Sequence, residues 1–424
     1  MAKVVIAAIG SRGDTAPMIA IGSRLQQAGH DVVLSAQSIF AELIESCGLR
    51  WLPHDIGIAA PDLNLDAVGN GLGLGDENPA KLIMEFMSPK GMQANGESLL
   101  KTLADEPADI LLLSPFAELA GHPLAEARGV PSLGVRMQPM SATKLYPPAI
   151  LGAWSAGPML NRAAGRFAAG AVDRIYRKPI AAFRSQLGLP RVSAKALRRR
   201  RTEAEWPILH GYSPTVAPRP ADWRPGLDVV GYWWPPRPLD WEPPEDVAHF
   251  LAAGPPPVYV GFGSLPMTRT DKEKAALVIG DALRQANVRG IVQSGWAGLS
   301  VASDDVITIG ETPHDWLFNH VSAVVHGCGA GITGAGLRAG LPSVSIPNPG
   351  GDQPFWARRL HNLGVSAGTL PRSKMTADSL AAAIRTAVTD DALRGNAKAV
   401  AAKLADEDGT GEVLKVVERL TKGH

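Results

Sequence analysis

Short apolar runs alternate with helix-forming stretches along this chain, on each side of a proline-rich segment. Apolar runs of four or five residues separated by amphipathic stretches are typical of βαβ units, in which helices connect parallel strands. The sequence therefore predicts an α/β protein with two doubly wound, Rossmann-like domains and a cleft between them. We expect strands at residues 4–8, 31–35, 110–114, 132–136, 258–261, 289–293, 306–309, 323–326 and 343–346. We expect helices at residues 17–28, 39–47, 272–285, 333–339 and 352–363, and three more at 377–387, 392–404 and 412–420 that cover the second sheet and return toward the first domain.

The segment between the halves is rich in proline and tryptophan. Residues 207–257 hold 13 of the 35 prolines, and residues 206–241 hold five of the ten tryptophans. Proline fixes φ and removes a backbone donor, so this segment should form little regular structure. We expect a first domain over residues 1–215, a connector over 216–245 and a second domain over 246–424. The side chains of Trp223, Trp233, Trp234 and Trp241 should lie against the seam between the domains.

The composition excludes several kinds of partner. A net charge of +1 over 424 residues argues against nucleic acid. The two cysteines, Cys47 and Cys328, are far apart and indicate no disulfide or metal framework. The N-terminal apolar run is too short for a signal peptide, and no run reaches the ~18 apolar residues of a membrane span. We expect a cytoplasmic protein.

The segment from residue 324 to residue 353 carries the most informative functional pattern. It reads VVHGCGAGITGAGLRAGLPSVSIPNPGGDQ: an apolar strand, His326, a glycine-dense turn, a short helix, a second strand and the pair Asp352-Gln353. Glycines let backbone N–H groups approach an anion, and a helix N-terminus adds about half a positive charge. A carboxylate and an amide are well suited to sugar hydroxyls. A phosphate site beside a sugar site indicates a nucleotide sugar.

The same letters also fit a dinucleotide-binding fingerprint. The glycines at positions 329, 331 and 334 spell G-x-G-x-x-G, and Asp352 follows about 20 residues later. In the dinucleotide fold the acid should close the next strand, whereas here Pro347 ends that strand and two glycines precede the acid. The fingerprint also asks for neither His326 nor Gln353. A dinucleotide-dependent enzyme stays the second interpretation.

The turn after the first expected strand offers another polar group. Gly10-Ser11-Arg12-Gly13-Asp14 lies between that strand and a helix that we expect to start at Pro17. Asp14 fits a helix cap, and it also fits a base that removes a proton from an acceptor hydroxyl, because this turn should face the other domain. Spacing alone leaves both interpretations open. Ser11 and Arg12 are candidates for contact with a phosphate from the opposite side of the cleft.

Taken together, these motifs make the chain similar to the family 1 nucleotide-sugar-dependent glycosyltransferases with the GT-B fold. It most resembles the bacterial branch that contains glycopeptide-antibiotic, sterol and mycobacterial glycolipid glycosyltransferases. The resemblance covers nearly the whole chain. It rests on Gly10 to Asp14 with Pro17, on Arg219-Pro220-Ala221-Asp222-Trp223 with Gly231-Tyr232-Trp233, on Gly261-Phe262-Gly263-Ser264, on Pro313-His314-Asp315-Trp316-Leu317-Phe318, and on the block from His326 to Gln353.

The resemblance implies a role for each matching residue. The first domain would bind the acceptor and the second the donor. Asp14 would be the general base of an inverting, metal-independent transfer of a hexose from a UDP- or dTDP-sugar, with no cofactor. The donor diphosphate would be held by His326, Gly329, Ala330, Gly331, Thr333 and Ser264, with Ser11 and Arg12 opposite. Asp352 and Gln353 would bind the sugar, and Glu311 and Thr312 would lie at the nucleobase. Trp296 would either stack on the nucleobase or fill the seam between the domains.

This chain departs from the family pattern in the glycine turn. Relatives commonly show His-His-Gly-Gly-Ala-Gly-Thr-Thr, whereas Gly327, Cys328 and Ile332 replace the second His, a Gly and the first Thr. One phosphate-facing hydroxyl is therefore missing, although Thr333 could compensate. A non-catalytic relative that binds a nucleotide sugar stays an alternative to the transferase, and so does a nucleotide-sugar epimerase.

The acceptor is readable only in type. Met84, Met87, Met140 and Tyr146 suggest an adaptable apolar wall, although core packing explains such residues about as often. We also expect the glycine-rich stretch 63–75 to lie in this region. The resemblance implies a large hydrophobic acceptor: a sterol, a polyketide, a glycopeptide or a lipid. The basic run 198–201 fits a solvated face, or a weak contact with anionic lipid at a membrane surface.

Overall fold

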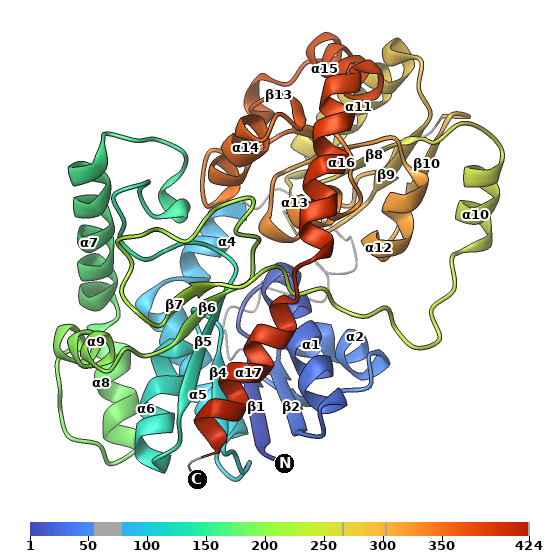
Figure 1. The fold of residues 1–424 in the computed structure, drawn as a ribbon. Coiled ribbons are helices and arrows are strands. Elements are labelled where there is room, and N and C mark those ends of the chain that lie inside the picture. Colours follow the sequence, from blue (N-terminus) through green and yellow to red (C-terminus); the bar gives the residue numbers. More distant parts are fainter. Residues whose placement is uncertain (55–78, 265–266, 302, 423–424) are drawn as a thin grey trace.

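The first half of the computed structural model is built on a seven-stranded parallel sheet with the order β3-β2-β1-β4-β5-β6-β7 (Figure 1). This order reverses direction between β1 and β4, as in doubly wound folds. The structure describes residues 1–54, 79–264, 267–301 and 303–422, so the stretch 63–75 lies outside the described residues. The strands are β1 (Lys3–Ala7), β2 (Asp31–Ala36), β3 (Arg50–Pro53), β4 (Ile110–Leu113), β5 (Ser132–Arg136), β6 (Ile208–His210) and β7 (Leu227–Val229).

The second half repeats this plan in a six-stranded parallel sheet. Its order is β10-β9-β8-β11-β12-β13, with the reversal between β8 and β11. The strands are β8 (Val258–Gly261), β9 (Gly290–Gln293), β10 (Val306–Ile309), β11 (Ala323–His326), β12 (Ser343–Ser345) and β13 (Ser366–Thr369). The expected α/β fold with two parallel sheets is confirmed. Ligands of such sheets bind beyond the carboxyl ends of the strands at the reversal.

Helices cover both faces of each sheet. In the first half they are α1 (Arg12–Gln27), α2 (Ala41–Ser46), α4 (Pro79–Phe86), α5 (Pro89–Thr102), α6 (Glu118–Arg128), α7 (Pro158–Ile175), α8 (Arg177–Gln186) and α9 (Ala194–Glu203). In the second they are α10 (Glu245–Ala252), α11 (Arg269–Ala286), α12 (His314–Leu317), α13 (Ala330–Arg338), α14 (Gln353–Asn362), α15 (Ala377–Thr389), α16 (Asp391–Ala405) and α17 (Gly409–Thr421). Short 3₁₀ turns occupy Ser38–Phe40, Ala149–Leu151, Phe318–His320 and Arg372–Lys374. Within the described part of the chain, no helix is long and apolar enough to cross a membrane.

Helix α1 begins five residues earlier than we expected. We placed its start at Pro17, because proline favours the first helical position, but Pro17 lies inside the helix. Ser11 is the N-cap, and Asp14 is the third residue of the helix. The backbone N–H of Ser11 donates to Oδ2 of Asp14 at 2.8 Å, which closes a capping box. This cap stabilises the turn before the proline, so the motif around Asp14 is helical and not a loop.

The proline-rich connector contains regular structure that we did not expect. Strand β7 lies inside residues 216–245 and pairs with β6, so the first sheet extends into this segment. Trp223 packs with Ile208 and Leu227 at that sheet and not at the seam between the halves, so its expected position was wrong. Trp233 is buried, and its Nε1 donates to the carbonyl of Gly409 at 3.2 Å. The seam therefore begins only after β7.

The two halves share one continuous apolar core. A single cluster of buried side chains runs from Met18 and Ile19 of α1 through Trp233 of the connector to Val413 and Val417 of α17. Figure 1 shows α17 lying beside α1, although it follows the second sheet in the chain. Of the three C-terminal helices that we expected to return toward the first domain, α17 packs on α1, whereas α15 and α16 pack against elements of the second half. This shared core sets the position of the strand ends of one sheet relative to those of the other.

Candidate active site

A cavity of about 690 Å³ lies between the two halves, where the carboxyl ends of both sheets meet. Its walls come from the turns that follow β1, β8, β10, β11 and β12. This is the position that two doubly wound sheets facing each other create for a ligand. Of the residues that we expected in the site, those that line the cavity are Ser11, Arg12, Asp14, Ser264, Glu311, Thr312, Gly329, Ala330, Gly331, Asp352 and Gln353.

Asp14 is held rigidly at the wall formed by the first half. Its Oδ2 accepts hydrogen bonds from the backbone N–H of Ser11 at 2.8 Å and from the Ser11 hydroxyl at 3.1 Å. Gly10 makes this position possible: its φ is +145°, and a Cβ there would come within 2.3 Å of Oδ2 of Asp14. Burial raises the pKa of Asp14 to about 6, the two bonds from Ser11 oppose that rise, and the charge of Asp352 adds to it. Asp14 is therefore both a partner in the capping box and a carboxyl group with a raised pKa.

Asp352 and Gln353 stand on the other wall, at the start of α14. Nε1 of Trp356 donates to Oδ2 of Asp352 at 2.7 Å, and burial raises the pKa of that carboxyl. The side-chain oxygen of Gln353 accepts the backbone N–H of Asn348 at 2.8 Å. This bond uses the amide oxygen and leaves the amide NH₂ as the group that can donate to a ligand. The pair thus offers one acceptor and one donor to hydroxyl groups in the cavity.

The N-terminus of α13 opens into the same cavity. Gly329 is its N-cap and makes no side-chain capping bond, so the first N–H groups of the helix are not used by the cap. A Cβ built at Gly329 or at Gly331 would meet nothing within 4 Å, so the space before the helix is open. Unpaired N–H groups and the helix dipole favour an anion in that space. Together with the nearby Ser264, this is the arrangement expected for a diphosphate.

His326 does not line the cavity, contrary to our expectation of a direct phosphate contact. It is buried at the end of β11, and its Nδ1 accepts the backbone N–H of Cys328 at 3.1 Å. The proton of the neutral ring is therefore on Nε2. Burial lowers the pKa of His326 to about 4, so the ring is uncharged at neutral pH. In this structure His326 shapes the glycine turn behind the cavity wall.

Two other expected residues also lie off the cavity wall. The Thr333 side chain is buried within α13, and its hydroxyl has no partner among the described residues. Trp296, which we considered for the nucleobase or for the seam, is only partly buried and packs against the core that joins the two halves. Thr333 is buried in α13, and Trp296 packs against the shared core. The sequence pattern does not distinguish such packing from contact with a ligand.

The cavity wall contains polar residues for which we predicted no role. His314, at the start of α12, lines it, and burial lowers the pKa of that ring to about 3, with Arg12 and His326 contributing. Gln138 and Gln293 follow β5 and end β9 at the same edge. The sequence did point to His314, because it follows β10 within the motif Pro313 to Phe318 that we quoted for the family resemblance. Single glutamines at strand ends carry no comparable pattern.

An ion pair crosses the cavity from one half to the other. Nη1 of Arg12 lies 2.9 Å from Oε2 of Glu311. We expected Arg12 at a phosphate and Glu311 near the nucleobase. In the structure these two side chains contact each other. A donor phosphate that reached Arg12 would have to compete with Glu311.

None of the four side chains that we expected at the acceptor lines the large cavity. Met84 and Met87 are exposed, at 69% and 42%. Met140 is half-buried away from it. Tyr146 is buried, packs edge-on against Phe355 at 5.1 Å and lines a second cavity of about 370 Å³. The residues of the first half that give the large cavity its apolar wall are Ile19, Leu43 and Met137.

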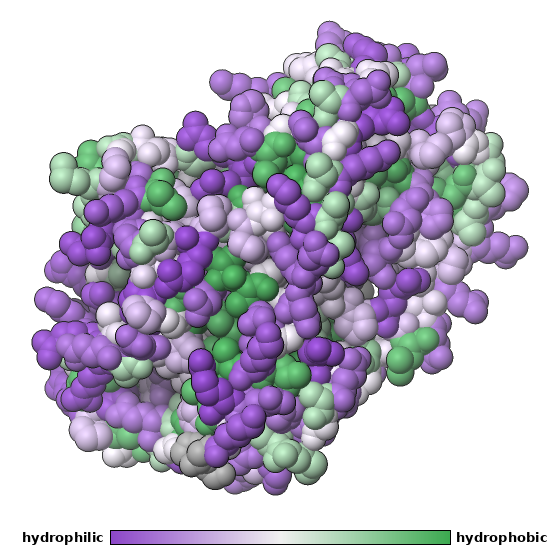
Figure 2. All heavy atoms as spheres, viewed as in Figure 1, coloured by the Kyte–Doolittle hydropathy of each residue, from purple (hydrophilic) through white to green (hydrophobic). Residues whose placement is uncertain are grey.

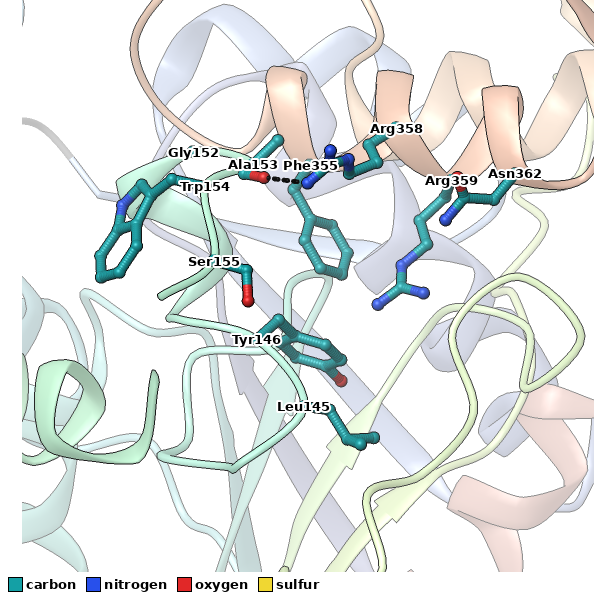
Figure 3. A pocket seen from close by; sticks show the side chains of 10 residues that line it. All are labelled: Leu145, Tyr146, Gly152, Ala153, Trp154, Ser155, Phe355, Arg358, Arg359 and Asn362. Atoms are coloured by element: carbon teal, nitrogen blue, oxygen red, sulfur yellow. Dashed lines mark hydrogen bonds between the residues drawn. The ribbon is translucent and has the colours of Figure 1, made fainter. Parts of the chain in front are cut away.

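The second cavity lies between the segment 145–155 and α14 (Figure 3). Nη1 of Arg358 donates to the carbonyl of Ala153 at 2.8 Å and so joins its two sides. The Arg359 guanidinium lies over the rings of Tyr146 and Phe355, at 5.0 and 4.9 Å from their centroids. Stacking of this kind orders the arginine. The second cavity is therefore lined by ordered side chains from both halves.

Comparison with known proteins places this geometry in context. Residues 290–420 match the family described as "Erythromycin biosynthesis protein CIII-like, C-terminal domain". The chain is 31% identical to sterol 3-beta-glucosyltransferase UGT80A2 of Arabidopsis thaliana, over 97% of this chain and 64% of that protein. It is 30% identical to O-mycaminosyltylonolide 6-deoxyallosyltransferase of Streptomyces fradiae, over 98% of this chain and 97% of that protein. The chain spans less than two thirds of the first of these relatives, and 35% of a sterol 3-beta-glucosyltransferase of Saccharomyces cerevisiae.

Solved structures share the whole fold. The glycotransferase of kitacinnamycin superposes with a TM-score of 0.69 at 18% identity, over 99% of each chain. The Streptomyces sp. SF2575 glycosyltransferase SsfS6, complexed with thymidine diphosphate, superposes with a TM-score of 0.62 at 18% identity, over 99% of this chain and all of that one. At this level of identity the likeness concerns the fold.

Proposed function

Because this chain belongs to the family 1 glycosyltransferases with the GT-B fold, we propose that it transfers a hexose from a UDP- or dTDP-sugar to a hydroxyl of a large hydrophobic acceptor. The observation that carries this proposal is the pairing, across one cavity, of Asp14 with its raised pKa and the open N-terminus of α13. A base on one wall and an anion site on the other are what an acceptor hydroxyl and a leaving diphosphate require.

The donor would bind against the second half. Its diphosphate would lie at the N-terminus of α13, with Ser264 beside it, and its hexose would reach Asp352 and Gln353. The complexes of SsfS6 with thymidine diphosphate and of VinC with dTDP, both of the same fold, support a nucleoside diphosphate as the leaving group. Glu311 and Thr312 at the end of the cavity would lie by the nucleobase. We propose that His326 acts indirectly, by positioning the turn through its bond to Cys328.

The reaction would proceed with inversion. Asp14 takes the proton of the acceptor hydroxyl, the acceptor oxygen forms a bond to the anomeric carbon, and the bond to the diphosphate oxygen breaks on the opposite face. The leaving diphosphate keeps the electron pair of that bond. A carboxyl with a pKa of about 6 is mostly ionised at pH 7 and still basic enough to assist. The helix N-terminus stabilises the charge that grows on the diphosphate, so we propose a metal-independent reaction that withstands a chelator.

The acceptor would be a sterol, a polyketide, a glycopeptide or a lipid. The relatives that act on sterols and on a macrolide support this range. Weak contact with a membrane surface is part of the proposal, because a sterol or lipid acceptor is held in a membrane. We propose a cytoplasmic location, which the two free and buried cysteines support.

Replacement of Asp14 by Asn tests the proposal. The variant keeps the shape and the capping oxygen but cannot accept a proton, so transfer should fall by ~10²–10⁴-fold while dTDP or UDP binding is kept. Calorimetry measures the binding, and mass spectrometry of a sterol or macrolide acceptor measures the transfer. Transfer by Asp14→Asn at the parental rate would show that the base is another group.

Thermal stability with UDP, dTDP, GDP or NAD separates the remaining alternatives. A nucleotide at ~100 times its Kd adds ~2.7 kcal/mol to the free energy of unfolding. Stabilisation by UDP or dTDP alone supports the donor site, and stabilisation by NAD alone would favour a dinucleotide enzyme. The dinucleotide interpretation requires the fingerprint after the first strand of a sheet, whereas here it follows β11, the fourth strand of its sheet in chain order. Donor binding with no transfer to any acceptor would favour the non-catalytic relative.

A further inference from the structure

Exposed large apolar side chains gather in one part of the first half. Of the fifteen that the described residues contain, nine lie within residues 145–175 and three more on or just after α4. Met159 and Phe167 of α7 are 84% and 79% exposed. The hydroxyl of Tyr176 donates to the carbonyl of Met87 at 2.7 Å and ties the two segments together. Exposed apolar side chains that gather in one place mark a surface that binds a partner or a membrane.

Helix α7 turns its apolar stripe outward. Met159, Ala163, Phe167 and Gly170 follow helical spacing and are all exposed. The opposite side packs closely through Gly165, where a Cβ would meet Ala142 at 2.6 Å. Figure 2 shows a few hydrophobic residues at the upper end of α7, with hydrophilic residues along the rest of this edge and over α8 and α9. The apolar stripe is therefore fixed in its outward orientation by packing.

The same helices hold an unusual excess of positive charge. Residues 158–203 contain twelve lysines and arginines and two acidic residues, in a chain whose net charge is +1. Some of these cations are structural, such as Arg198, which binds Asp173 at 2.8 Å. Among the described residues, none forms an ion pair with Arg166, Arg174, Arg177 or Lys178, and all four are exposed. Unpaired cations thus flank the apolar stripe.

We propose that α7, with the segment 145–157 before it and the start of α8, docks on the surface of an anionic phospholipid bilayer. Apolar side chains enter the boundary of the acyl chains, while arginines and lysines contact the lipid phosphates. Nucleic acid would use the cations but leave Met159 and Phe167 in water. A second copy of the chain would bring two strongly positive surfaces together. The combination of exposed apolar groups and unpaired cations fits the bilayer best.

The docking surface also borders the second cavity. Leu145 and Trp154 belong to the exposed apolar group and line that cavity (Figure 3). A bilayer bound to α7 would therefore lie beside a hollow between the two halves. Only the purpose of docking, which is to reach an acceptor held in a membrane, rests on the proposed function.

Vesicle flotation tests docking without any sugar transfer. The wild-type chain should float with vesicles of phosphatidylcholine containing 30% phosphatidylglycerol and not with phosphatidylcholine alone. Reversal of two charges, Arg166→Glu with Arg174→Glu, should weaken binding by about 25-fold or more, because each cation at a surface contributes about a fivefold factor. Salt at ~0.5 M should release the wild type, since it screens surface charge. Phe167→Ser with Met159→Ser should also weaken binding.

Matched substitutions on α11 provide the controls. Leu277→Ser removes a side chain that is 72% exposed, close to the 79% of Phe167, and Lys274→Glu reverses an exposed cation in the other half. Both controls should bind vesicles like the wild type, and the melting shift with dTDP or UDP reports folding of every variant. Any of three results would overturn the proposal. The chain could bind neutral and anionic vesicles equally, the α11 controls could lose as much vesicle binding as the α7 variants, or the chain could bind a duplex oligonucleotide and not the vesicles. Failure of transfer with intact vesicle binding would count against the proposed function alone.

Discussion

At the scale of single residues, Asp14 combines a contact that stabilises a helix start with a position in the cavity that suits the proposed base. It closes the capping box of α1 and lines the cavity between the halves. The cap fixes one carboxylate oxygen against Ser11, so the side chain is held in place before an acceptor arrives. Burial that raises its pKa would be a defect in a purely structural cap, whereas it suits a base. The same contacts thus give position and chemistry.

The pH dependence of activity should follow Asp14. In the proposed mechanism its carboxylate form is the base, so kcat/KM should rise with pH through an apparent pKa near 6. A bound diphosphate adds negative charge near Asp14 and should raise that pKa. The rise of kcat with pH should therefore occur at a higher pH than the rise of kcat/KM.

The free energy of unfolding should depend on pH in the opposite direction. The folded pKa exceeds the ordinary 3.8, so the contribution of Asp14 to stability is present below about pH 4 and is lost as pH rises through about 6.

Initial rates and urea unfolding between pH 4 and 8 measure both trends. Asp14→Asn provides the control, since its unfolding curve should lack the part of the pH dependence that Asp14 contributes. An activity profile that is flat from pH 5 to 8 would contradict the assignment of the base.

The two cysteines should be inert in the folded protein. Cys328 is fully buried, burial raises its thiol pKa to about 12, and burial also raises the pKa of Cys47. Thiol reagents need an accessible thiolate. We expect less than one thiol per chain to react with Ellman's reagent in native buffer, and two in guanidinium chloride. Rapid native labelling of Cys328 would mean that the glycine turn opens to solvent.

At the scale of elements, the sequence predicts most of the fully buried strands and misses three that are only partly buried. Every strand that we expected exists, because four or five buried apolar residues in a row leave few alternatives. β3, β7 and β13 were missed, since three or four residues that are not uniformly buried carry little pattern, and β6 was missed because its buried run is only three residues long. The location of the site was predictable because parallel topology brings strand ends together. The acceptor wall was not, because a methionine in an amphipathic stretch does not show which face is buried: Met84 is 69% exposed.

The turn between β1 and α1 should tolerate no side chain at Gly10. Gly10→Ala would place a Cβ 2.3 Å from Oδ2 of Asp14 at a φ of +145°. We expect a loss of about 1–3 kcal/mol in unfolding free energy and a larger loss of transfer than of nucleotide binding. Gly29→Ala is the matched control, because its φ is +86° and its Cβ would meet nothing within 4 Å. The control should lose stability and keep the ratio of transfer to binding; a similar change of that ratio in both variants would contradict the role of the turn.

At the scale of the whole molecule, the pair of Arg12 and Glu311 links the halves across the cavity. Their side chains are 34% and 46% exposed, so the pair should add no more than about 1 kcal/mol to stability. We expect the pair to affect nucleotide binding, because Glu311 competes with a donor phosphate for Arg12. Glu311→Gln should tighten dTDP or UDP binding several-fold, Arg12→Gln should weaken it, and neither should shift the melting temperature much.

Calorimetric titration measures these affinities. Asp315→Asn serves as the control, because Asp315 pairs with Arg237 at 2.7 Å on the same cavity wall without involving Arg12. Weaker nucleotide binding in Glu311→Gln would show that Glu311 contacts the nucleotide itself, as the family resemblance implies.

The packing of α17 on α1 has a consequence for how the chain is made. The two helices pack against each other, and the side chains of Arg24 and Asp408, which are 384 positions apart in the sequence, are 3.4 Å apart. Ribosomes add ~5–20 residues per second, so roughly 20–80 s pass between the synthesis of α1 and that of its cover. During that interval the apolar face of α1 is open to water and to chaperones. The domain that is translated first is thus sealed only after the second has been made.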